Sequence, residues 1–365
     1  MSIPGDIRLR QVTFLSWDDP LPVTVGPSGP APGSGAIEIP GSRQTPTRTW
    51  LEPTAGPAGV AGRIVDPDGT ARPVALGPDG GLVALPAPPS AVAPRAGGVW
   101  ALTEESLTGV DADGSVAVRT GFGGVRLIPA AGDAVWLLGS DTCRHIAGDG
   151  TVTAQAPWSD PFNAAVAGAD LCGWEPGNPT GMVCVAPDGT RGHRDPGRTR
   201  EAFERLLAFG ETGIVTALLR TLVYRDPSRS TALALTGAGL TSAGQPFLAG
   251  EHDGRPWLWR AGAPPLPLPA EGRGQVLQVA GDRVLVRAGE VATWWEGDVP
   301  VRKFPADELT FRDEIFPAAW LVSPPFPFSA GPDGSIVVAA SGPTGIAVLT
   351  LRWPPNGTGV ANARR

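Results

Sequence analysis

Short apolar runs separated by turn-forming residues recur along the chain at steady intervals. Residues 90–121 and 125–158 follow the same order: an apolar run, a glycine turn, an apolar run with tryptophan, a polar turn, a third apolar run, an Asp-Gly turn and an alternating run. Short runs bounded by Gly, Asp and Pro are typical of strands joined by tight turns. Each unit is therefore predicted to form four short antiparallel strands.

The units can be aligned on the glycine of the turn between their first and second predicted strands. Six units are anchored, 34 to 42 residues apart, on Gly97, Gly132, Gly168, Gly210, Gly244 and Gly281. Weaker units anchored on Gly59 and near Gly331 bring the expected number to eight. The last unit lacks a fourth strand, whereas residues 7–15 form a strand without a unit. We therefore expect this N-terminal strand to complete the last unit and close a ring.

The tandem units, over residues 47–352, resemble the repeats of β-propellers in general. This resemblance implies an all-β fold of eight four-stranded blades, with seven as the alternative. The chain lacks the repeated motifs of WD40, kelch, Asp-box and quinoprotein propellers, so no family's functional residues can be transferred to it.

We expect residues 1–365 to form a single domain, in which segments outside the repeats connect or extend the units. Residues 16–46 are a Pro/Gly-rich connector, 305–325 are an insertion, and 353–365 are a flexible tail. Apolar residues between 199 and 210 also recur at helical spacing. The repeat register instead predicts that 205–209 form the innermost strand of the fifth unit.

Composition narrows the class of protein. With 42% hydrophobic and 18% charged residues the chain is globular, and its 50 Gly and 41 Pro fit a turn-rich all-β fold. The net charge is -7, without a basic cluster among aromatics, which argues against nucleic acid as a partner. Neither a secretory signal nor an apolar run of membrane-spanning length is visible. We expect a cytoplasmic location and no membrane partner. The excess of Arg over Lys is typical of a GC-rich bacterial genome.

Cysteine and histidine residues cluster in the third and fourth units, at Cys143, His145, Cys172, Cys184 and His193. Their spacing is irregular and lacks the paired cysteines of zinc sites, so we expect no metal and no other cofactor. Cys143 and His145 are two apart on a predicted strand and share a face. If the hairpin between Cys172 and Cys184 is centred on Asn178, these two cysteines lie directly opposite each other. In a cytoplasmic chain we expect them to be two thiols.

Catalytic motifs are absent from the sequence. There is no nucleophile elbow, phosphate loop or zinc-protease helix, and we expect no enzymatic activity. The alternative is a hydrolase or lyase above the central channel, built on Glu251, His252 and Asp253. The seven Asp-Gly pairs are interpreted as hairpin turns and not as metal loops.

In a propeller the second-to-third-strand turns and the connectors between blades open on one face. Here these segments are long and acidic, which favours a binding surface for another protein of basic or mixed charge. A second hypothesis is a carbohydrate-binding propeller, with tryptophan rings holding a sugar between blades, or a small molecule or glycan in the channel. The predicted binding residues are Glu104, Glu105, Asp141, Glu175, Glu251, His252, Asp253 and Glu290, with Phe311, Phe316 and Trp320 of the insertion.

Overall fold

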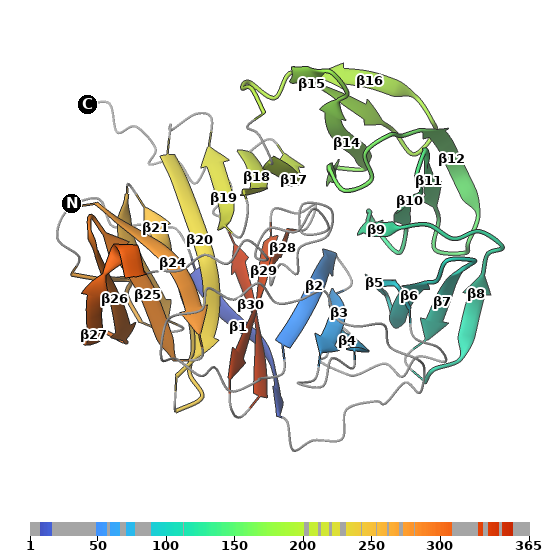
Figure 1. The fold of residues 1–365 in the computed structure, drawn as a ribbon. Helices are drawn as coiled ribbons and strands as arrows, with labels where there is room; N and C mark the ends of the chain where they lie inside the picture. The colour runs from blue at the N-terminus through green and yellow to red at the C-terminus, as the bar shows by residue number, and fades with distance from the viewer. Residues whose placement is uncertain are drawn as a thin grey trace, which may run out of the picture.

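A computed structural model describes most of the predicted strands (Figure 1). The described residues are 8–16, 49–56, 59–65, 71–76, 89–111, 113–200, 204–210, 213–218, 221–226, 231–241, 243–252, 254–260, 263–269, 273–280, 282–308, 328–330, 335–342 and 345–352. Within these ranges the only helical segment is a 3-10 turn, η1 (Ala306–Glu308). No helix of the described part has the length and apolar character needed to cross a bilayer.

The second, third and fourth units are complete four-stranded antiparallel sheets in which each strand pairs with the next (Figure 1). The second contains β5 (Ala91–Arg95), β6 (Gly98–Leu102), β7 (Leu107–Asp111) and β8 (Val116–Arg119). The third contains β9 (Arg126–Pro129), β10 (Val135–Leu138), β11 (Thr142–Ile146) and β12 (Val152–Pro157). The fourth contains β13 (Ala164–Ala167), β14 (Asp170–Glu175), β15 (Asn178–Val185) and β16 (Arg191–Arg194).

The first and seventh units have the same order of strands. The first contains β2 (Thr49–Gly56), β3 (Gly59–Val65) and β4 (Ala71–Leu76). The seventh contains β24 (Gly274–Ala280), β25 (Arg283–Ala288), β26 (Val291–Glu296) and β27 (Val299–Pro305). Together these sheets confirm an all-β fold of propeller type, built from tandem antiparallel units.

The fifth and sixth units share one long strand. The fifth contains β17 (Glu204–Gly210), β18 (Gly213–Leu218), β19 (Thr221–Asp226) and β20 (Thr231–Leu240); the sixth adds β21 (Pro246–His252), β22 (Arg255–Arg260) and β23 (Leu266–Pro267). Residues 231–235 of β20 pair with β19, and residues 233–240 pair with β21. The sequence suggested two separate strands here. β17 confirms the strand expected at 205–209, so tertiary pairing overrides the helical spacing.

The N-terminal strand completes the last unit. β1 (Arg8–Ser16) pairs antiparallel with β30 (Gly345–Arg352), which pairs with β29 (Ser335–Gly342), and β29 pairs with β28 (Phe328–Ala330). This is the closing strand that the sequence predicted. β29 lies beside β2 and beside β20, whereas the seventh unit packs against β20, β21 and β22. The number of blades and the single-domain boundaries stay predictions. The connector after Ser16, the insertion beyond Glu308 and the tail 353–365 lie outside the described residues.

Tight turns explain the glycine and Asp-Gly patterns. Gly97, Gly132, Gly168 and Gly244 have φ between 64° and 74°, where side chains with a Cβ are strained. In three Asp-Gly turns the aspartate Oδ1 accepts the N–H of the residue two positions on, from Asp113 to Ser115, Asp149 to Thr151 and Asp188 to Thr190. The backbone hydrogen bonds lower the pKa of Asp149 and Asp188, whereas for Asp113 the hydrogen bond from the Ser115 hydroxyl is the larger cause and the backbone bond the second. The interpretation of these pairs as hairpin turns is confirmed.

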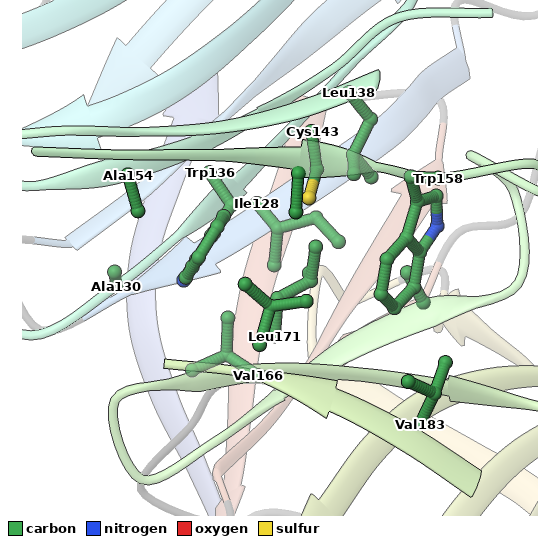
Figure 2. Close-up of a cluster of buried hydrophobic side chains, with 13 residues drawn as sticks. Ile128, Ala130, Trp136, Leu138, Cys143, Ala154, Trp158, Val166, Leu171 and Val183 are labelled. Carbon is green, nitrogen blue, oxygen red and sulfur yellow. The ribbon is translucent and has the colours of Figure 1, made fainter. Parts of the chain in front are cut away.

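Apolar side chains on both faces of the second, third and fourth sheets pack against the neighbouring units. All four residues of β10 are buried: Val135 and Leu137 face the second unit, whereas Trp136 and Leu138 face the fourth. Figure 2 shows this second face, where Trp136 and Cys143 of the third unit meet Leu171 of the fourth. A sheet buried on both faces needs uninterrupted apolar runs, which is the pattern seen in the sequence.

Two tryptophans at equivalent positions join successive units. Trp100 and Trp136 are fully buried. The indole Nε1 of Trp100 donates to the Asp133 carbonyl at 2.8 Å, and that of Trp136 donates to the Ala169 carbonyl at 3.2 Å. Each acceptor lies in the first turn of the following unit. The repeated tryptophan therefore supplies both apolar contact and a polar link between sheets.

Candidate functional site

The second-to-third-strand turns and the connectors between units lie at the same end of the sheets. The backbone N–H of Trp158, in the connector after β12, donates to the carbonyl of Asp141 in the β10–β11 turn at 2.8 Å. In the seventh unit the N–H of Ala306 donates to the carbonyl of Glu290 in the β25–β26 turn at 2.7 Å. The face expected from the sequence is therefore formed from these two kinds of segment.

Four of the predicted binding residues are free carboxylates on this face. Glu104 and Glu105 lie in the β6–β7 turn, Asp141 in the β10–β11 turn and Glu290 in the β25–β26 turn. All four are exposed, and their side chains form no ion pair or hydrogen bond with any other residue that the structure describes. We call these four residues the acidic turn surface.

Other predicted residues are engaged in the fold. The Glu175 carboxylate accepts a hydrogen bond from Asn178 Nδ2 at 2.9 Å, and lies 3.9 Å from the His193 imidazole. Glu251 is half-buried at the end of β21, not in the following turn, and its Oε1 accepts the backbone N–H of Val276 at 2.8 Å. Burial raises the pKa of the Glu251 carboxyl. Glu251 therefore links the sixth unit to the seventh.

The remaining predicted residues are not brought together. His252 follows Glu251 as the last residue of β21 and is partly buried. Asp253 and the insertion residues Phe311, Phe316 and Trp320 lie outside the described residues.

A cavity of about 290 Å³ lies between the third and fourth units. Residues of the β10–β11 turn, the connector after β12 and the fourth sheet line it: Ser140, Asp141, Pro157, Trp158, Ser159, Asp160, Asn163, Trp174, Pro176, Val183 and Arg191. Figure 2 shows Trp158 and Val183 at one end of the apolar cluster between the two sheets. Of these lining residues, only Asp141 belongs to the predicted site. The serines, Asn163 and Trp158 lie in turns or connectors without a repeated motif, so the sequence offered no signal for them.

Buried polar contacts hold the connector that forms one wall of this cavity. The Trp158 indole donates to the carbonyl of Asp160 at 2.9 Å, and the Asn163 Oδ1 accepts the N–H of Leu206 in β17 at 2.9 Å. Arg126 donates to the carbonyl of Pro161 at 3.1 Å. Burial, together with the nearby positive charge of Arg205, lowers the pKa of Arg126 to about 10, although Asp160 opposes this shift. Hydrogen bonds thus tie the wall to the third and fifth units.

The cysteines are paired as the register predicts but differ in oxidation state from the expectation. Cys172 on β14 lies directly opposite Cys184 on β15, and the two form a disulfide rather than two thiols. Cβ atoms of directly opposed residues are close enough for such a bond. Cys143 is a free, buried thiol, and burial raises its pKa to about 11. No cluster of three or more metal-ligating side chains occurs in the described ranges.

Cys143 and His145 share a face of β11, as the sequence predicted. The His145 ring contacts Trp136 edge-on, with 4.9 Å between ring centroids, and its Nδ1 lies 2.6 Å from the hydroxyl of Thr153. Burial lowers the pKa of this imidazole below its usual 6.5. His145 is therefore a buried residue of the core, where its charged form is disfavoured.

We expect the fold to lose stability as the pH falls through about 6.5, because the unfolded chain then takes up a proton that folded His145 does not. Above that pH the contribution of His145 is fully present. Melting temperatures measured from pH 8 to pH 5 should decline less in a His145→Phe variant than in the wild type. Equal declines would show that His145 is not kept neutral by the fold.

Comparison with known proteins identifies no family. No family model matches the chain, and no curated protein matches it in sequence. Among solved structures, a streptogramin B lyase is 11% identical, with a TM-score of 0.30 over 70% of this chain and 90% of that chain. Kluyveromyces lactis Hsv2 is 6% identical, with a TM-score of 0.34 over 71% of this chain and 99% of that chain. At such low scores these similarities carry no argument about the site, and the fold assignment rests on the strand pairing.

Proposed function

We propose that the protein is a non-catalytic binding scaffold that docks another protein of basic or mixed charge on the acidic turn surface. The observation that supports this proposal is that Glu104, Glu105, Asp141 and Glu290 are exposed at one end of the sheets without cationic partners among the residues described. Uncompensated charges of one sign steer partners of the opposite sign and disfavour partners of like sign.

Aspartates in the hairpin turns at the opposite end of the sheets, unlike the acidic turn surface, take part in local hydrogen bonds. Asp113, Asp149 and Asp188 accept hydrogen bonds within their own hairpins, so their carboxylates serve the turns. The carboxylates of the acidic turn surface have no such role. Their removal should therefore change binding and leave folding intact.

The test is charge reversal of Glu104, Glu105 and Glu290 to lysine in one variant. We expect the captured partner to bind this variant roughly tenfold or more weakly, because like charges then face each other. Wild type and variant would be used as baits in a lysate of the encoding organism, with binding measured at two salt concentrations. The melting temperature should be unchanged, since exposed side chains without partners contribute little to stability.

A matched control comes from the seventh unit. Asp298 is exposed in the β26–β27 turn, at the other end of the sheet from Glu290. Asp298→Lys makes, at one position, the change of charge that the test variant makes at each of three, and it should leave binding intact. Glu251 is unsuitable for this test, although the sequence placed it on the same surface, because its bond to Val276 makes it part of the fold. Equal capture by wild type and triple variant, or no specific capture by wild type, would overturn the proposal.

A further inference from the structure

The cavity between the third and fourth units offers hydrogen-bond donors and acceptors side by side. Asp141 and Asp160 provide carboxylate acceptors, Arg191 provides donors, and Ser140 and Ser159 provide hydroxyl groups that act as both. A group that both donates and accepts can satisfy such a mixed lining. Hydroxyl groups do this, whereas a carboxylate, an ammonium or a guanidinium does not.

One buried donor of the lining lacks a partner among the residues described. This donor is the Nε1 of Trp174, a side chain that is only 4% exposed. Asn163 is 3% exposed, and its Oδ1 accepts the backbone N–H of Leu206. Buried indole and amide groups normally find partners, because an unmet donor costs about 1–3 kcal/mol. A ligand with oxygen acceptors would supply what the protein does not.

Charge argues for a neutral ligand. A cation in the cavity would meet Arg191, with the positive charges of Arg126 and Arg205 close to Asp160 behind the wall. An anion would meet the carboxylates of Asp141 and Asp160. The positive and negative groups oppose each other, so neither kind of ion gains a net advantage.

The remaining walls are apolar. Trp158, Trp174, Val183 and two prolines line the cavity, and about 290 Å³ is at the lower end of the volumes of small-molecule sites. A cavity of this volume has room for a ligand with a single ring. Because Trp158 and Trp174 are only 6% and 4% exposed, a ligand meets indole edges and not open faces. This limits the apolar contribution and implies weak binding.

We propose that this cavity binds a neutral monosaccharide, either free or as the terminal residue of a glycan. The sugar hydroxyls donate to the Asp141 and Asp160 carboxylates and accept from Asn163 and Arg191, while the carbon face of the ring lies against the apolar wall. The sugar site does not rest on the protein-binding proposal, although Asp141 belongs to both surfaces.

The test is saturation-transfer NMR with D-glucose, D-galactose, D-mannose and N-acetyl-D-glucosamine as separate probes. We expect at least one to bind the wild type with a dissociation constant in the millimolar range. Ser159→Phe, which fills the cavity from an exposed position, and Asp141→Asn, which keeps its shape, should each weaken binding about fivefold or more. A glycan array with the same proteins separates a free sugar from a terminal residue.

Glu105→Gln is the matched control, because Glu105 occupies the same turn of the second unit as Asp141 in the third, and it should bind the sugar like the wild type. The proposal is overturned if no sugar binds, or if binding survives both cavity variants. Preferential binding of acetate or arginine, added as charged comparison probes, would also overturn it. Sugar binding by a wild-type protein that captures no specific partner would contradict the scaffold proposal alone.

Discussion

A Trp136→Ala variant is expected to lower the free energy of unfolding by about 3–5 kcal/mol. The Trp136 side chain is fully buried between the third and fourth units, and its removal leaves a large cavity beside Ile128, Val166 and Leu171. The change also leaves the Ala169 carbonyl without the indole N–H. Equilibrium denaturation in urea, at fixed protein concentration, measures the effect.

Trp136→Phe is the control for this prediction. Phenylalanine keeps most of the apolar contact and loses the hydrogen bond to Ala169, so a smaller cost of about 1–2 kcal/mol is expected. A cost below about 1 kcal/mol for Trp136→Ala would contradict the buried packing of the two units. Trp100→Ala tests the equivalent contact between the second and third units and should behave in the same way.

Replacement of both Cys172 and Cys184 by alanine is expected to cost about 3 kcal/mol. The disulfide closes a loop with a sequence separation of 12 residues, and a loop of this size restricts the unfolded chain by about that free energy. Cys143→Ala leaves the disulfide intact and is the control for the loss of a buried sulfur. Denaturation of the double variant should match that of the wild type under reducing conditions.

A count of free thiols in the unfolded, unreduced protein tests the bond directly. One thiol, from Cys143, is expected, and three would show that the cysteines are unpaired as the sequence suggested. One thiol would also argue against the cytoplasmic location expected from the sequence, because disulfides persist mainly in oxidising compartments.

Much of the fold could be predicted because its signals are local. Turn glycines such as Gly97 and Gly132 adopt positive φ, and the apolar runs between them become strands buried on both faces. The prediction that Cys172 lies opposite Cys184 is confirmed, but the hairpin is not centred on Asn178 as the prediction supposed. The chain turns at residues 176–177, Asn178 pairs with Glu175, and a register irregularity after Trp174 brings the two cysteines opposite each other. The N-terminal strand could be assigned to the last unit because that unit lacked one.

Contacts between units could not be read in this way. Glu251 looks like a surface residue in the sequence, but the arrival of β24 beside β21 buries it and gives it the N–H of Val276. The repeat register predicts two strands within Thr231–Leu240, but pairing with β19 and then with β21 keeps this segment one continuous strand.

The sequence by itself determined the strands, their turns, the order within each unit and the acidic character of one set of turns, since these depend on neighbouring residues. Only the tertiary structure decided which carboxylates remain free, that two cysteines are bonded, and that Trp158, Asn163 and Trp174 surround a cavity. The physical reason is that burial and hydrogen bonding depend on residues far apart in the chain, and no local pattern records which surfaces will meet.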